Sequence, residues 1–296
     1  MRFVTQWLLP ALLAGSISAI ADAQAWLPRQ GNTGVEVAFN DTFNRDHYLP
    51  NGDEIDVGHT RTQAVSFAAS YALTDRMLFA ASIPYTRAKY GGTHPHRGTT
   101  IDDGQYHGYF TDWRLEAHYQ VSEWPIAFAP YVALVIPSHH YPSLGHAAPG
   151  RNLQERWLGF FAAKSLDSWL PRSYVQARYN FAFVETVAGV GHDRSNADFE
   201  LGHFLNRAWS LRAVASWQKT HGGIDVPVPT TSPLYPHHDQ LAAERYVQLG
   251  AGAAWNFSAR SGVYVLYKGA VSGANGHKLN SGLTLGWTSE FAPQDN

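Results

Sequence analysis

The feature that most constrains this chain is a two-residue alternation of polar and apolar side chains over long segments. Between residues 109 and 121, polar side chains occupy the even positions from 112 onward and apolar ones occupy the odd positions. Successive side chains of a β-strand point to opposite faces, so this segment predicts a strand with one polar and one apolar face. The pattern recurs at 173–184, 211–218 and 244–257, whereas helical periodicity is weak. The sequence therefore predicts an all-β fold.

The predicted strands are long for a soluble sheet. Strands of globular proteins cluster near about 5–6 residues, whereas a tilted membrane strand needs roughly 9–11. Most of the alternating segments reach or exceed the membrane length, which favours strands that cross a bilayer. Twelve candidates lie near 34–44, 60–72, 76–87, 109–121, 125–136, 153–165, 173–185, 196–206, 209–219, 244–257, 261–271 and 277–288.

The connections between these strands alternate in length. Short turns fall near 74–75, 122–124, 166–172, 207–208 and 258–260, and longer segments fall at 45–59, 88–108, 137–152, 186–195, 220–243 and 272–276. Short periplasmic turns and long extracellular loops are typical of outer-membrane barrels. We therefore predict a single antiparallel transmembrane β-barrel of about twelve strands over residues 34–291. An even strand count places both termini on the periplasmic side.

Tryptophan placement agrees with this orientation. Five tryptophans lie within a few residues of a predicted short turn or of the last strand's end. Indole rings prefer the boundary between lipid tails and water, and membrane barrels carry aromatic girdles there. The five are Trp124, Trp169, Trp209, Trp255 and Trp287.

The segments that flank the predicted barrel indicate export. Arg2 precedes an apolar stretch over 7–20, which ends in the small-x-small sequence Ala21-Asp22-Ala23. This order is typical of a secretory signal peptide, and Pro10 and Gly15 interrupt the stretch too much for a membrane helix. We predict a signal peptide at 1–23, a periplasmic lead-in at 24–33 that also has room to enter the lumen, and a C-terminal tail at 292–296. The expected location is the outer membrane of a Gram-negative bacterium.

Composition excludes several function classes. Charged residues make up 16% of the chain and aromatic residues 14%, and the net charge is −2. This balance predicts no nucleic-acid partner; outer-membrane lipid and a small-molecule solute are the partners that a barrel implies. Cysteine is absent, which excludes disulfides, thiolate metal sites and cysteine nucleophiles.

Two adjacent segments resemble a known family. Tyr71-Ala72-Leu73-Thr74-Asp75-Arg76 leads into a strand that ends Ser82-Ile83-Pro84-Tyr85, and a later strand reads Asp112-x-Arg114-Leu115-Glu116-x-x-Tyr119. Both are similar to motifs of the outer-membrane family named for the MetA pathway of phenol degradation. Ala72 stands where that family usually has glycine, and 108–111 departs from its Gly-Leu-Gly-Asp turn. The resemblance implies a barrel that passes small, often aromatic or hydrophobic compounds, and it implies no catalytic residue.

The polar strand faces predict a lumen with charges of both signs. Such charges fit a substrate path, but they also fit a salt-bridged interior that only holds the barrel shut. Glycines at 250, 252, 282 and 286 leave room beside the charges, which favours the path. The predicted lumen-lining residues are Asp112, Arg114, Glu116, Arg156, Lys164, Arg178, Glu200, Arg212, Glu244 and Lys268.

The sequence gives little support for an enzymatic activity. His277 and Ser281 share one strand face, as a lipase pair would, but four residues of strand span about 13 Å. A nucleophile and its base must approach to about 3 Å, and the His-x-Ser-Asn-Gly signature of outer-membrane phospholipases is absent. We expect no enzymatic activity, no catalytic residue and no cofactor.

Histidine is unusually frequent, at 15 residues, and it concentrates in the predicted outer loops. The densest groups are His94-Pro95-His96, His139-His140 with His146, and His237-His238 with Asp239. Imidazole with carboxylate suits Zn, Cu or Ni. The spacing defines no coordination geometry, so no residue is assigned as a metal ligand. Passive uptake of small apolar or aromatic solutes is the predicted function, with a metal-handling surface protein or a purely structural barrel as alternatives.

Overall fold

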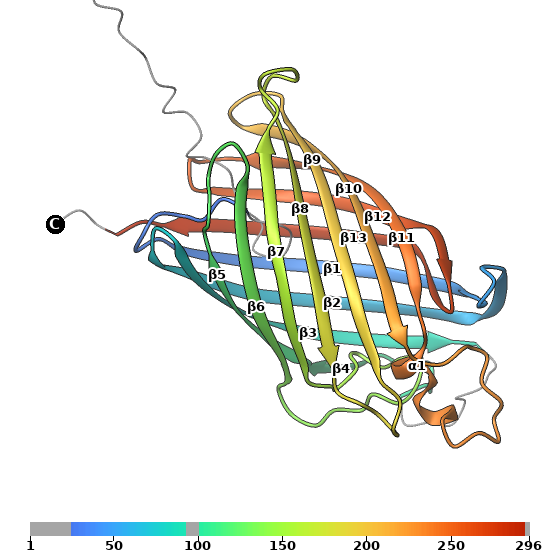
Figure 1. Ribbon diagram of the computed structural model, residues 1–296. Coiled ribbons are helices and arrows are strands. Elements are labelled where there is room, and N and C mark those ends of the chain that lie inside the picture. The colour runs from blue at the N-terminus through green and yellow to red at the C-terminus, as the bar shows by residue number, and fades with distance from the viewer. Residues whose placement is uncertain (1–24, 93–100, 294–296) are drawn as a thin grey trace, which may run out of the picture.

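The computed structural model describes residues 25–92 and 101–293, and almost all of them lie in one antiparallel sheet that closes on itself (Figure 1). The predicted signal peptide lies outside the described residues. The strands are β1 (Thr33–Tyr48), β2 (Glu54–Thr74), β3 (Met77–Gly91), β4 (His107–Phe110), β5 (Asp112–Tyr119), β6 (Ala127–Pro137), β7 (Glu155–Ser165), β8 (Ser173–Val184), β9 (His192–Phe204), β10 (Trp209–Gly222), β11 (Arg245–Asn256), β12 (Ser261–Ala274) and β13 (Gly276–Phe291).

The barrel wall has twelve strands because β4 and β5 are two parts of one strand. Both pair with β3, β5 along Met77–Ser82 and β4 along Tyr85–Ala88. They are separated by Thr111, whose backbone N–H donates to the carbonyl of Pro84 at 3.0 Å. Closure comes from pairing of β1 with β13 on one side and with β2 on the other. The predicted all-β, twelve-stranded antiparallel barrel is confirmed.

Two predicted loops are shorter than expected. Strands β1 and β2 continue through most of 45–59, and β12 and β13 leave only Asn275 between them. Asn275 has a φ of 62°, in the left-handed region that asparagine tolerates better than most residues. The polar residues near these hairpins still pair with the neighbouring strands. A strand whose backbone is hydrogen-bonded to its neighbours can continue beyond the lipid into water.

The remaining long connections gather at one end of the barrel, called here the long-loop end. They include the 3-10 turn η1 (Tyr235–His237) and the one-turn helix α1 (His238–Leu241), which Figure 1 shows at the end opposite the last residues of β13. Among the described residues, no helix combines the length and the apolarity needed to cross a membrane. The five tryptophans predicted as a girdle, at 124, 169, 209, 255 and 287, are all exposed.

The two faces of the wall differ as the alternation predicts. Along β5, the side chains of Glu116 and His118 are buried, whereas those of Trp113, Leu115 and Tyr119 are exposed. In a closed barrel the sheltered face is the interior, so the polar side chains of β5 point inward and the apolar ones outward. The exposed apolar residues of the other strands form the corresponding lipid-facing surface.

Inward tyrosines cover inward glycines on neighbouring strands. In three cross-strand pairs a Cβ on the glycine would collide with the tyrosine ring, so the ring lies flat against the wall. Gly286 therefore does not leave the free space expected of it, because Tyr264 occupies that space. The pairs are Tyr131–Gly159, Tyr174–Gly202 and Tyr264–Gly286.

The lead-in segment enters the barrel at the short-turn end. Ala25 is fully buried in an apolar cluster with inward residues of β6 and β7, among them Tyr131 and Phe161. Trp26 packs edge-on against Tyr174, with 6.3 Å between the ring centroids. The segment thereby narrows the interior at this end.

Candidate functional site

A carboxylate on the inward face of β5 organises the charges inside the barrel. Glu116 Oε1 lies 2.6 Å from Arg114 Nε and 3.7 Å from Arg178 Nη2, and its Oε2 lies 2.6 Å from His118 Nε2. Arg114 and His118 share a strand face with Glu116, since each is two residues away. Arg178 reaches the same carboxylate from β8. The glutamate is nearly completely buried, so these partners compensate the loss of water around its charge.

Arg178 also lies among aromatic rings. Its Nε donates to the hydroxyl of Tyr131 at 2.9 Å, and its guanidinium carbon is 5.2 Å from the centroid of that ring. Trp157 and Phe161 approach at 5.4 Å and 5.5 Å. These distances allow cation–π attraction, which strengthens where water is excluded. The interior therefore places a fixed cation against an aromatic surface.

Three further ion pairs lie among the inward side chains. Arg194 pairs with Glu155, and Arg212 lies 3.8 Å from Glu200. Arg151 lies 3.6 Å from Glu244, which also accepts a hydrogen bond from Gln218 at 3.1 Å. Asp112 accepts a hydrogen bond from Tyr141 Oη at 2.6 Å.

A cavity of about 280 Å³ opens beside these pairs, between the inward faces of β7 to β12. Its wall contains four cationic side chains and one acidic side chain, Asp198, together with the rings of Trp157 and Tyr246. No ion pair of the described residues includes Lys268, so its charge faces the cavity without a carboxylate within 4.0 Å. The cations are Arg151, Arg178, Arg194 and Lys268.

Two residues predicted to line the lumen lie on the other face. Arg156 and Lys164 are exposed on β7, where the inward positions are 155, 157, 159, 161 and 163. The prediction for these two residues was wrong because β7 does not alternate by polarity: its inward face carries Trp157, Gly159 and Phe161. Of the other predicted residues, Glu116, Arg178 and Glu200 are buried, and Asp112, Arg114, Arg212, Glu244 and Lys268 are partly buried.

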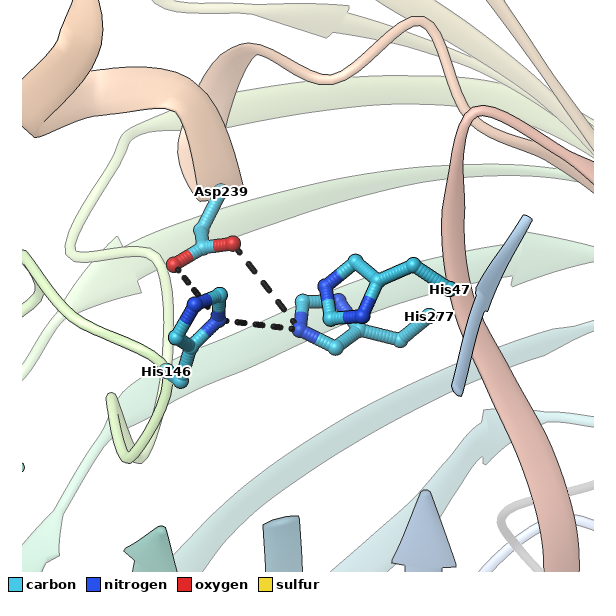
Figure 2. A group of neighbouring side chains, drawn as sticks. All are labelled: His47, His146, Asp239 and His277. Carbon is cyan, nitrogen blue, oxygen red and sulfur yellow. Dashed lines mark hydrogen bonds and ion pairs between the residues drawn. The ribbon is translucent and has the colours of Figure 1, made fainter. Parts of the chain in front are cut away.

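A second polar cluster lies at the long-loop end. It brings together His47 from the end of β1, His277 from the start of β13, His146 from the loop after β6, and Asp239 from α1 (Figure 2). One ligand atom from each of the four residues lies within 4.8 Å of the others. His47 and His277 are direct cross-strand partners, so their rings project side by side, with centroids 4.1 Å apart.

Contacts between loops hold His146 and Asp239 in this position. Asp102 accepts hydrogen bonds from the backbone N–H groups of His146 at 3.1 Å and Ala147 at 2.8 Å, and Thr60 Oγ1 donates to the carbonyl of His146. Gln240, next to Asp239, donates to the carbonyl of Arg151 at 2.8 Å. The two loops are thus fastened to each other and to the wall.

The charge on Asp239 governs the electrostatics of this cluster. Burial alone would raise the pKa of Asp239, but the imidazoles of His146, His277 and His238 outweigh it and hold that pKa well below its usual range. Burial likewise disfavours a charged His146, yet Asp239 raises the pKa of that imidazole above its ordinary value. Asp239 is therefore an ionised carboxylate, and His146 is its cationic or hydrogen-bonding partner.

Only part of this cluster was visible in the sequence. His146 and Asp239 belong to histidine groups noted there, whereas His47 was not singled out and His277 was considered only with Ser281. Of the other members of those groups, His139 and His140 are exposed and His237 bonds to Gln240. His238 is buried with its Nε2 3.4 Å from Asp239 Oδ1, but it is not one of the four residues whose ligand atoms converge. His94 and His96 lie outside the described residues.

Comparison with known proteins bears on the fold. No protein-family model and no curated protein matches the sequence, so the resemblance to the MetA-pathway family stays a prediction. The solved COG4313 outer membrane channel from Pseudomonas putida F1 is similar in structure, with a TM-score of 0.71 and 14% identity over 92% of this chain and 100% of that one. This chain folds as an outer-membrane β-barrel.

The same architecture serves more than one purpose. The β domain of the Bordetella autotransporter BrkA matches with a TM-score of 0.53 and 11% identity, over 88% of this chain and 100% of that domain. Since a channel and an autotransporter domain share the barrel, the function of this chain has to be argued from its interior.

Proposed function

We propose that this barrel is an outer-membrane channel for the passive uptake of small solutes with an aromatic or apolar body. The observation that carries the proposal is the cavity of about 280 Å³ in the interior of the barrel, which is lined by charged, polar and aromatic side chains. The likeness to a solved outer membrane channel supports the same function.

The chemistry of the cavity favours solutes that also carry an acidic group. Its four cations exceed its single carboxylate, although Arg151, Arg178 and Arg194 each share their charge with a glutamate. Lys268 remains to attract an anion. Trp157 and Tyr246 offer flat surfaces to an aromatic ring, and the proposed solute class is therefore small aromatic carboxylates.

Along the path, the paired charges act as polar walls and Lys268 acts as the attracting group. Ion pairs across the interior keep the desolvation cost of the wall low and narrow the passage. The solute path proposed here is lined by Asp112, Arg114, Glu116, Arg178, Arg212, Glu244 and Lys268.

Uptake into proteoliposomes tests the proposal. Purified barrel is reconstituted, and entry of benzoate, benzamide and glucose is compared with entry into protein-free liposomes of the same lipid. We expect the protein to accelerate benzoate most, benzamide less and glucose least, since only benzoate combines a ring with a negative charge. Equal entry of all three solutes with and without protein would refute the channel, and a preference for glucose would refute the solute class.

A further inference from the structure

We propose that His47, His146, His277 and Asp239 bind one divalent metal ion, Zn²⁺ or the similar Cu²⁺ or Ni²⁺, at the mouth of the barrel. The proposal concerns a site apart from the solute cavity, and its test does not depend on transport. It rests on the geometry of the four side chains, on their chemistry and on the environment of His47.

The distances within the cluster are close to those of a tetrahedral site. Zinc binds imidazole nitrogen and carboxylate oxygen at about 2.0–2.1 Å, which places neighbouring ligand atoms about 3.3 Å apart. Here His146 Nδ1 lies 3.4 Å from Asp239 Oδ2 and 3.4 Å from His277 Nε2, and His277 Nε2 lies 3.8 Å from Asp239 Oδ1. These three side chains therefore already face one another, with one oxygen of Asp239 near each imidazole. The ligand atom of the fourth residue, His47, lies within 4.8 Å of the other three, so a movement of its side chain completes the set.

The donor set selects a class of metal. Three imidazoles with one carboxylate suit Zn²⁺, Cu²⁺ or Ni²⁺, whereas Ca²⁺ and Mg²⁺ prefer sets made of oxygen alone. Three protein nitrogens and one oxygen also fill a four-coordinate site, which is typical of a structural rather than a catalytic metal. The cluster is thus expected to hold its ion rather than to activate water.

His47 supplies an independent observation. Both of its ring nitrogens are buried, and neither has a hydrogen-bond partner in the described structure. Burying such groups without partners is unfavourable, and buried polar groups in proteins are nearly always satisfied. A bound metal ion would satisfy one of these nitrogens directly. The ring already stands 4.1 Å from that of His277 and 5.4 Å from that of His146.

The position of the site gives the ion a structural role. His47 and His277 belong to the wall, while His146 and Asp239 belong to two separate loops (Figure 2). One ion on all four residues ties both loops to the wall across the mouth. The side chain of His277 is 30% exposed and that of Asp239 15%, so the cluster is not sealed from water. The bound metal ion would then hold both loops against the wall of the barrel.

The rival explanation is a cluster held only by hydrogen bonds and the charge of Asp239. Zinc titration of the purified, folded barrel distinguishes the two, provided that the protein carries no histidine tag. We expect one equivalent of Zn²⁺ to bind, with Ca²⁺ unable to compete. His47→Ala and His277→Ala should each weaken binding at least tenfold. His139→Ala and His140→Ala, in the same loop as His146 but exposed, should leave binding unchanged.

Cobalt spectroscopy keeps the test independent of whether a variant folds. Co²⁺ added to the wild-type barrel is expected to give the intense visible absorption of a four-coordinate ion, and Zn²⁺ should displace it. Absence of stoichiometric binding, a weak octahedral spectrum, or full affinity in a folded His47→Ala, His277→Ala double variant would overturn the proposal. Folding of each variant is verified by its heat-dependent gel migration.

Discussion

Glu116 in the wall and Asp239 at the mouth are both sheltered carboxylates with histidine and other polar neighbours, yet they are assembled differently. Two partners of Glu116 lie two residues away on its own strand, and the third, Arg178, comes from β8. The partners of Asp239 come from the loop after β6, from β13 and from its own neighbour His238. The first network follows from strand periodicity, and the second exists only once the loops have packed.

This difference has a consequence for what each cluster does. The Glu116 network pairs a carboxylate with two guanidinium groups and an imidazole, so it needs no further ion. The mouth cluster has one carboxylate for three imidazoles, and both nitrogens of His47 are left without hydrogen bonds. The wall network is thus built from opposite charges that balance one another, whereas the mouth cluster has more imidazole ligands than its one carboxylate can pair and is suited to binding an ion from solution.

The largest effect is expected from breaking the wall network. Arg178→Ala removes one cation from Glu116 and the group that packs on three aromatic rings. Removing one partner of a buried ion pair costs about 3–5 kcal/mol. We expect the free energy of unfolding to fall by about 3 kcal/mol, the lower end of this range, because Arg114 and His118 still face Glu116. Urea unfolding in lipid bilayers measures it.

Arg156→Ala is the matched control for that change. Arg156 is exposed on the outward face of β7, so its removal should alter the free energy of unfolding by less than about 1 kcal/mol. A loss as large as that of Arg178→Ala would mean that the faces of β7 and β8 have been assigned wrongly.

The next effect concerns the mouth. Zinc at one hundred times its dissociation constant should stabilise the wild-type barrel by about 2.7 kcal/mol, since it binds only the folded state. The same concentration should leave the His47→Ala, His277→Ala double variant unchanged. Stabilisation of both proteins alike would indicate that zinc acts elsewhere on the chain.

A smaller effect is expected from Asp102→Ala. This change leaves the backbone N–H groups of His146 and Ala147 without their carboxylate partner, at a cost of about 1–3 kcal/mol. The loss should be confined to the loop, so trypsin should cut after Arg151 faster while hydrogen exchange in the strands stays slow. Faster exchange throughout the wall would show that loop and wall unfold as one unit.

The contrast between wall and mouth also explains what the sequence could predict. Alternation places Asp112, Arg114 and Glu116 on one face because side chains two residues apart in a strand point the same way. It misplaced Arg156, since the inward face of β7 packs Trp157 and Phe161 and carries no polar rhythm. The pairing of His47 with His277 depends on a register shift between Asn44 and His47, which no local pattern encodes. His146 and Asp239 meet only through loop packing.

The central claim is that the inward face of the wall carries the solute path, and a salt-gradient measurement tests it most directly. Lys268→Glu reverses an inward cation beside the cavity, and Arg156→Glu makes the same kind of change on the outward face. In planar bilayers with unequal KCl on the two sides, the wild-type reversal potential should indicate anion preference. Lys268→Glu should shift it clearly toward cations, and Arg156→Glu should not. A barrel without conductance, or equal shifts from both variants, would contradict the account.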